Sequence, residues 1–119
     1  MSSDEYAKEP EDVARLIIKR LNEGDADGVA ALYEPNAVLA YPIDQPTTGR
    51  EAIREIYQEM VNAGVKFGNE SSLPIVQFEN LALTSTQSAD NTGVRVQVVR
   101  RQVDGSWLRI IDRPADSSS

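Results

Sequence analysis

The change of hydrophobic period near residue 64 is the feature that most constrains how this chain folds. Before it, apolar residues mostly recur every three or four positions, and after it they tend to alternate with polar residues. The first pattern is typical of amphipathic helices and the second of half-buried strands. Helices followed by a run of strands predict an α+β fold, with the helices packed on one side of a mainly antiparallel sheet.

Two helices are expected in the first 36 residues. Pro10 suits a first helical position, and the apolar residues of this segment then share one face until Gly24 stops the helix. Asp25 is expected to cap a short second helix, which buries Tyr33 and ends at residues 34–36. A short strand is predicted over residues 37–41.

A third helix and four strands complete the expected set. Thr48–Glu51 has the spacing of a capping box, which predicts a helix that runs to Gly64. Asp104–Gly105 is a strong signal for a two-residue turn between the last two strands. The expected strands are residues 73–78, 81–86, 94–103 and 106–112.

Composition excludes several kinds of chemistry. The 119 residues contain no cysteine and no histidine, so disulfides, thiolate nucleophiles, imidazole bases and Cys- or His-ligated metals are all excluded. Any acid–base chemistry must use Asp, Glu, Tyr, Lys or water, and we expect neither a cofactor nor a metal. The net charge of −7 argues against binding to nucleic acid or to anionic membranes.

The length suits one domain over residues 1–119, with frayed polar tails at about 1–8 and 115–119. No apolar run approaches the roughly 20 residues that a membrane span needs. The acidic, polar start of the chain does not resemble a secretory signal, so a cytoplasmic location is expected.

Four stretches in this order resemble the NTF2-like superfamily, in particular its SnoaL-like and ketosteroid-isomerase-like branches. They are Leu21–Asp27, Ala31–Val38, Gly49–Tyr57 and Arg101–Trp107 continuing to Asp112. The resemblance implies a cone, in which a curved sheet wraps around three N-terminal helices and leaves an apolar cavity. It also implies a homodimer that pairs through the convex face of the sheet. Members include isomerases, cyclases and hydrolases, and others only bind or assemble, so the fold does not settle the function.

The residues that ketosteroid isomerases use are replaced in this chain. Aligned on the family's motifs, Ile17, Tyr41 and Val99 stand where the oxyanion-hole Tyr, the basic Asp and the protonated Asp would stand. Steroid isomerase activity is therefore not expected. Tyr57 matches a tyrosine of the family's internal hydrogen-bond network.

The alternation of the last two strands predicts a candidate site. A two-residue turn at Asp104–Gly105 would place Gln97 opposite Asp112, with Arg95 on the diagonal. The resemblance implies that this face lines the cavity. Asp112 and Tyr41 are the candidate catalytic residues. The candidate ligand-binding residues are Tyr33, Tyr57, Arg95, Gln97, Val99 and Ile110. A structural salt bridge near the mouth of the cone is the alternative reading of Arg95, Gln97 and Asp112, and a bulge between residues 97 and 103 would undo the face assignment.

The same alternation assigns an apolar, arginine-bearing set to the opposite face, where a partner subunit could supply acids to the arginines. The expected dimer-interface residues are Val96, Val98, Arg100, Trp107, Arg109 and Ile111. Two functions remain open from the sequence. The first is binding of a small apolar molecule in the cone, with cofactor-free isomerase, cyclase or hydrolase chemistry if the protein is an enzyme. The second is a non-catalytic dimeric assembly or regulatory module with an inert cavity.

Overall fold

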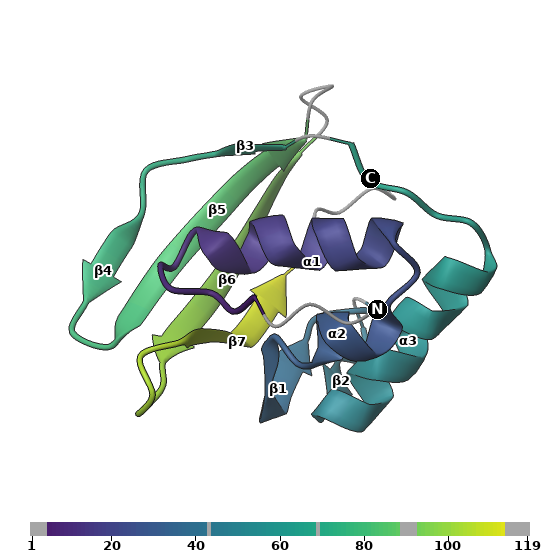
Figure 1. The fold of residues 1–119 in the computed structure, drawn as a ribbon, viewed down its shortest axis with the longest axis horizontal. Helices are drawn as coiled ribbons and strands as arrows, with labels where there is room; N and C mark the ends of the chain where they lie inside the picture. Colours follow the sequence, from purple (N-terminus) through teal and green to yellow (C-terminus); the bar gives the residue numbers. More distant parts are fainter. Residues whose placement is uncertain (1–4, 43, 69, 89–92, 114–119) are drawn as a thin grey trace.

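The structure, a computed structural model, describes residues 5–42, 44–68, 70–88 and 93–113. Three helices lie against one face of a curved seven-stranded sheet, as Figure 1 shows. The strand order is β2-β1-β7-β6-β5-β3, and β4 also pairs with β5. Every pairing is antiparallel except that of β1 with β7. The predicted α+β class, with a mainly antiparallel sheet, is confirmed.

The first helix, α1 (Asp12–Asn22), supplies much of the core. Its buried apolar residues are Val13, Leu16, Ile17 and Leu21, the spacing that an amphipathic helix requires. The short helix α2 (Ala26–Ala30) follows, and the Asp25 carboxylate accepts a 2.9 Å hydrogen bond from the backbone N–H of Gly28. The predicted N-cap at Asp25 is therefore confirmed.

The third helix, α3 (Arg50–Asn62), buries Ile53 and Tyr57 against α1 and the sheet. The predicted capping box is wrong, because Gly49 is the N-cap residue and no side chain caps the helix. Gly49 has φ = 100°, a backbone conformation that glycine adopts without strain. Arg50 instead turns back, and its Nε and Nη2 atoms donate to the carbonyl oxygen of Tyr33 at 2.9 and 2.6 Å.

Strand β1 (Tyr33–Leu39) begins four residues earlier than the sequence suggested. Tyr33 was expected in a helix, but it already pairs with Arg109 of β7 (Trp107–Arg113). The register between β1 and β7 shifts between Tyr33 and Val38, across Pro35. A proline inside a strand is tolerated at such an irregularity, which explains why the local pattern was misleading. Strand β2 (Thr47–Thr48) pairs with the end of β1.

Two short strands replace the single strand expected at residues 73–78. They are β3 (Glu70–Ser72) and β4 (Val76–Phe78), and both pair with β5 (Leu81–Ser88). Residues 73–75 lie between them, where the backbone N–H of Leu73 still donates to the carbonyl of Ser85 at 2.9 Å. Strand β6 (Val94–Arg101) then lies between β5 and β7.

The turn between β6 and β7 has three residues rather than the predicted two. The N–H of Gln102 donates to Ser106 and the N–H of Gly105 donates to Gln102, with Gly105 at φ = 89°. A turn followed by a left-handed glycine is the usual three-residue hairpin connection. It shifts the register by one residue, so that Arg101 faces Trp107 and Val99 faces Arg109.

A bulge in β7 then cancels that shift. The pairing changes between Val98 and Val99, so that Val98 faces Ile111 and Ile110 is the additional residue. Beyond the bulge, Gln97 faces Asp112, as predicted. The two one-residue shifts cancel at Gln97 and Asp112. Between the turn and the bulge, however, the side chains of β7 lie on the opposite face from the one predicted.

The chain before α1 is tied to the domain. Residues 5–8 were expected to belong to a frayed tail, yet Ala7 is fully buried and its carbonyl accepts from the N–H of Trp107 at 3.0 Å. The expected frayed residues 1–4 and 115–119 lie outside the described residues. Among the helices that the structure describes, none is both long and apolar enough to cross a membrane.

Candidate functional site

The three-residue turn moves two predicted interface residues into the interior. Trp107 and Arg109 were expected on the convex face, but both are buried on the concave face with Val99 and Gln97. Ile110, expected to line the cavity, is the bulged residue and is only half-buried. The physical reason is that side chains alternate along a strand, so a one-residue shift exchanges the two faces.

A buried polar network lies on the concave face where β1, β7 and α3 meet. The phenol of Tyr33 donates to Asp112 Oδ2 at 2.6 Å, and Arg109 Nη1 donates to the same oxygen at 3.1 Å. The phenol oxygens of Tyr33 and Tyr57 are 2.7 Å apart. Because Tyr33 donates its single hydroxyl hydrogen to Asp112, the hydrogen bond between the two phenols must be donated by Tyr57 to Tyr33. The network thus has a defined direction, from Tyr57 through Tyr33 to Asp112.

The charges of this network are almost completely removed from water. Asp112 is 4% exposed and Arg109 is 5% exposed. Burial is the largest single effect and lowers the pKa of Arg109, but Asp112, Tyr33 and Tyr57 together outweigh it, so the net effect raises the pKa. The Arg109 guanidinium also lies over the Tyr33 ring, with 5.6 Å between its central carbon and the ring centroid.

Both phenols are held in their neutral form at ordinary pH. Burial, followed by the nearby negative charge of Asp112, raises the pKa of Tyr33 well above its usual value. The same two causes, in the same order, raise the pKa of Tyr57 to about 12. A neutral phenol donates one hydrogen bond and accepts others, so the network offers polar contacts without a mobile charge.

The predicted cluster of Arg95, Gln97 and Asp112 is divided among other contacts. Asp112 binds Tyr33 and Arg109, whereas the Gln97 side chain accepts a 2.7 Å hydrogen bond from Thr84 Oγ1 of β5. The Arg95 guanidinium stacks on the ring of Phe67, with its central carbon 4.9 Å from the ring centroid.

The other candidate residues are placed differently. Val99 is fully buried in the core, so it adds apolar surface but no chemistry. Tyr41 is 51% exposed and follows the end of β1, next to a cis peptide bond to Pro42. Its side chain is not part of the buried network.

The convex face retains four of the predicted interface residues. Val96 and Val98 are half-buried there, and Ile111 is exposed. Arg100 lies opposite Leu108 of β7. The carboxylate that pairs with Arg100 belongs to Glu34 of the same chain rather than to a partner subunit, because Arg100 Nε and Nη2 each donate to it at 2.9 Å.

Sequence reasoning missed Arg109 and Thr84 as members of the interior polar set. Arg109 and Asp112 are three positions apart, which normally places two strand residues on opposite faces. Only the bulge at Ile110 brings them to one face, and the sequence carries no separate signal for it. Among the described residues, no group of three acidic side chains is arranged to hold a metal ion.

The model of the SnoaL-like domain matches residues 13–110, which is most of the chain. The chain belongs to the SnoaL-like family. The predicted resemblance is thereby confirmed at the level of the family. A comparison with curated proteins finds no significant match.

Solved structures similar to this SnoaL-like domain share its fold at low identity. One, from Thiobacillus denitrificans, is described as an association domain of calcium/calmodulin-dependent protein kinase type II. It is 16% identical with a TM-score of 0.74, over 95% of this chain and all of its own. A ketosteroid isomerase-like protein from Erwinia carotovora atroseptica is 20% identical with a TM-score of 0.67, over 87% of this chain and 89% of its own.

A third similar structure is a Mycobacterium tuberculosis protein of unknown function. It is 18% identical with a TM-score of 0.72, over 89% of this chain and 73% of its own. At these identities the likeness concerns the fold alone. Another similar structure, from Novosphingobium aromaticivorans, is described as an NTF2-like protein with a cystatin-like fold. The NTF2-like fold expected from the sequence is therefore confirmed by the curved sheet and by these structural neighbours.

Proposed function

We propose that this protein binds a small, largely apolar molecule in the cone, with the network of Tyr33, Tyr57, Asp112 and Arg109 as the polar end of the site. The observation that carries this proposal is a buried donor with no partner. Arg109 Nε is buried, and among the described residues no hydrogen-bond acceptor meets it. Buried polar groups are normally satisfied, so such an orphan calls for an occupant, a water molecule or a ligand atom.

The surroundings of the network suit a ligand with one polar group. Ile17, Ile53 and Val99 are buried in the same core, and the half-buried Ile56 and Met60 pack against it. Apolar walls with a few convergent polar groups are the usual make-up of small-molecule sites. Tyr57 ends the directed network, so its oxygen retains acceptor capacity for a ligand hydroxyl.

Chemistry at this site would be cofactor-free isomerisation, cyclisation or hydrolysis. Asp112 Oδ2 already accepts from Tyr33 and from Arg109, so a proton-accepting role would fall to the other carboxylate oxygen. Tyr57 is the donor best placed to polarise a ligand oxygen, because it can turn its hydrogen away from Tyr33. The Tyr33 oxygen, which would then lose the hydrogen bond from Tyr57, would still accept one from Arg109 Nη1 at 3.4 Å.

Native mass spectrometry of gently purified protein, followed by extraction into organic solvent, tests this proposal. A stoichiometric small molecule released by the solvent supports it and names the ligand's chemical class. The Asp112→Asn variant then separates a site from a structural pair. Reduced ligand affinity or turnover in folded variant protein supports a site, whereas an effect on stability alone argues for a purely structural pair.

The exposed apolar row on the convex face favours a second candidate function, which is dimeric assembly. Directly paired residues share a face, so Val76, Leu83, Val98 and Ile111 form one row across β4, β5, β6 and β7. Three members of this row are exposed, and Phe78 beside it is 70% exposed. Contiguous exposed apolar surface of this kind marks an interaction site in soluble proteins.

The partner that fits this row is a second copy of the chain, packed face to face on the convex sheet. Sedimentation velocity over a range of concentrations tests the assembly. A dimer without any bound molecule would favour the assembly function over ligand binding, whereas a monomer at all concentrations would refute it.

A further inference from the structure

The connection between α3 and β3 covers part of the core. Residues 65–68, the strap, lead from the end of α3 toward β3, and Figure 1 shows them in the link between these two elements. Val65 and Phe67 are half-buried, whereas Lys66 and Gly68 are exposed. Phe67 packs against the buried core residues, so it is the large side chain with which the strap closes on the interior.

A single residue of α1 fastens the strap. Asn22, the last residue of α1, donates from Nδ2 to the carbonyl oxygen of Phe67 and accepts from the N–H of Phe67 with Oδ1, both at 2.9 Å. The ammonium group of Lys66 donates to the carbonyl oxygen of Asn22 at 2.7 Å. Within the described part of the chain, the strap's one further hydrogen bond joins the N–H of Val65 to the carbonyl of Met60 in α3. Release by Asn22 therefore frees the strap from α1.

Both ends of the strap have room to turn. Gly64, which precedes it, has φ = 76°, and a Cβ added at Gly64 or at Gly68 would meet no atom within 4 Å beyond its chain neighbours. Rotation of the backbone at these two glycines therefore displaces no packed side chain. Hinges of moving segments are a few residues of this kind, at the ends of secondary-structure elements.

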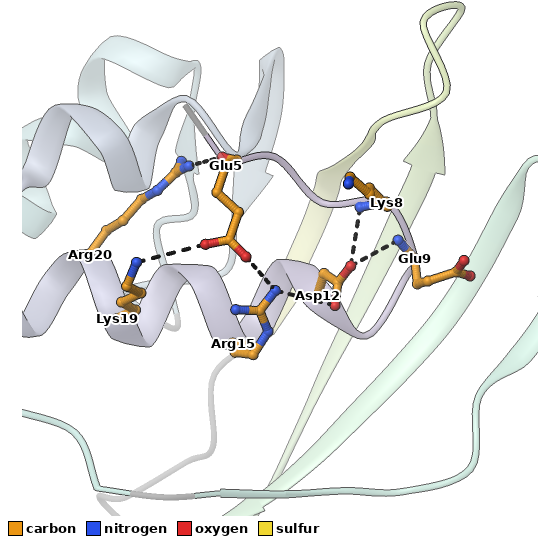
Figure 2. Close-up of polar contacts among 7 residues, drawn as sticks. All are labelled: Glu5, Lys8, Glu9, Asp12, Arg15, Lys19 and Arg20. Atoms are coloured by element: carbon orange, nitrogen blue, oxygen red, sulfur yellow. Dashed lines mark hydrogen bonds and ion pairs between the residues drawn. The ribbon is translucent and has the colours of Figure 1, made fainter. Parts of the chain in front are cut away.

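The segment before α1 also covers the core, since Ala7 is fully buried, but it is fastened by more contacts. Figure 2 shows that several side chains of α1 hold this segment, namely Asp12, Arg15, Lys19 and Arg20. Regions with few contacts open locally before regions with many. We therefore expect the strap to open more readily than the segment before α1.

Phe67 lies at the Tyr57 end of the buried network. The guanidinium of Arg95 stacks on its ring, with 4.9 Å between the central carbon and the ring centroid. Arg95 is two positions before Gln97 on β6, so the two side chains share the concave face. Burial and then Asp112 raise the pKa of Tyr57, and the charge of Arg95 acts against them, so this guanidinium is within electrostatic reach of the phenol. The strap thus covers the end of the network at which Tyr57 can meet a ligand.

We propose that the strap is the gate of the cone site, through which a ligand enters and leaves when Asn22 releases Phe67. This inference rests on the ligand binding proposed above. Arg95 belongs to β6 and forms the fixed side of the gate, whereas Phe67 moves with the strap. The two bonds between Asn22 and Phe67 set the open population, so weakening them should speed both entry and release.

An introduced thiol measures the opening of the strap without any ligand. The chain has no cysteine, so Gln97→Cys carries a single thiol at a position that is 3% exposed, on the concave face. Its rate of reaction with methyl methanethiosulfonate, a small neutral reagent, reports the open population. We expect Asn22→Ala to raise this rate at least tenfold, because both bonds to Phe67 are lost. Phe67→Ala should raise it as well, since it removes the cover itself.

Two controls separate opening of the strap from general loosening of the fold. Ala37→Cys places the thiol at a 2% exposed position of β1 next to the start of α3, at the opposite end of that helix from the strap. Its reaction rate should be the same with and without Asn22→Ala. Asn62→Ala removes an exposed bond with Gln58 and should leave the labelling of Gln97→Cys unchanged. Unchanged labelling of Gln97→Cys in Asn22→Ala and Phe67→Ala, or equal acceleration at both thiols, would overturn the gate.

Failure of the gate is distinguishable from failure of the cone site. A small molecule released from the protein, together with unchanged labelling, would overturn the gate alone. Accelerated labelling in a protein that carries no small molecule would show an opening strap but overturn the ligand binding that the gate serves. Accelerated labelling in a protein that does carry one supports both.

Discussion

The phenol of Tyr33 donates a 2.6 Å hydrogen bond to Asp112 and so joins the start of β1 to the end of β7, two parallel neighbours. The carboxylate oxygen that accepts this bond also accepts from Arg109. Three buried side chains from two strands therefore depend on one oxygen atom. Loss of Asp112 leaves both donors without this acceptor in a dry interior, and loss of Tyr33 or Arg109 removes a donor from the buried carboxylate, which makes the network sensitive to conservative substitutions.

Replacement of Asp112 tests the charge balance of this network. Asp112→Asn leaves Arg109 buried without a counter-charge, so we expect the free energy of unfolding to fall by about 3 kcal/mol. Urea denaturation, followed by the fluorescence of the single Trp107, measures the change. Asp27→Asn is the matched control, because Asp27 forms an exposed pair with Arg54, and it should cost less than about 0.5 kcal/mol. Equal stability of the two variants would contradict the prediction.

Tyr33 and Tyr57 should contribute differently to the free energy of unfolding. Tyr33→Phe deprives Asp112 of a donor and Tyr57 of an acceptor, so we expect a loss of about 2 to 3 kcal/mol. Tyr57→Phe removes a single terminal hydrogen bond and should cost about 1 kcal/mol. The double variant should cost less than the sum, because both substitutions remove the same bond between the phenols. A cost of Tyr57→Phe that equals or exceeds that of Tyr33→Phe would show that the network does not run in the direction described.

Stability should fall in alkaline solution because the phenols resist ionisation in the fold. The pKa of Tyr57 rises from 10.0 to about 12, so above pH 10 the unfolded chain loses this proton before the folded chain does. The stabilising contribution is complete below pH 10 and is lost as the pH rises toward 12. Two pKa units correspond to about 3 kcal/mol for this group.

Urea denaturation at a series of pH values from 8 to 12 measures this dependence. Tyr57→Phe should flatten the decline between about pH 10 and pH 12, since its share of the titration is removed. Val29→Ala serves as the control, because it weakens the core at a fully buried position while it retains both phenols. A decline that is equally steep in Tyr57→Phe and in Val29→Ala would argue against the assigned role of Tyr57.

Charge introduced into the convex row should dissociate a dimer without unfolding the subunit. Leu83 and Ile111 are 41% and 48% exposed, so Leu83→Lys and Ile111→Lys are tolerated in the isolated fold. In a face-to-face dimer each would bury a lysine near its symmetry mate, and we expect at least tenfold weaker association. Val103→Lys is the control, because Val103 is fully exposed at the β6–β7 turn outside the row. Equal dissociation by all three lysines would place the interface elsewhere.

Much of the α-helical part was predictable because its signals are local. The apolar face of α1 follows from residues within eleven positions, and the Asp25 cap follows from a side chain and a backbone N–H three positions apart. The start of β1 was not predictable in this way. Tyr33 is a strand residue only because β7, more than seventy positions away, pairs with it.

By itself, the sequence determined the order of elements, the presence of the last hairpin and the family to which the fold belongs, because each follows from periodicity or from short motifs. It also placed Gln97 opposite Asp112, although only because two opposite register shifts cancel between the turn at Gly105 and the bulge at Ile110. Tertiary structure alone decided which residues surround Asp112. A strand has a side-chain period of two, so one extra residue exchanges its faces, and whether β7 accepts that residue depends on how Trp107 and Arg109 pack inside the cone.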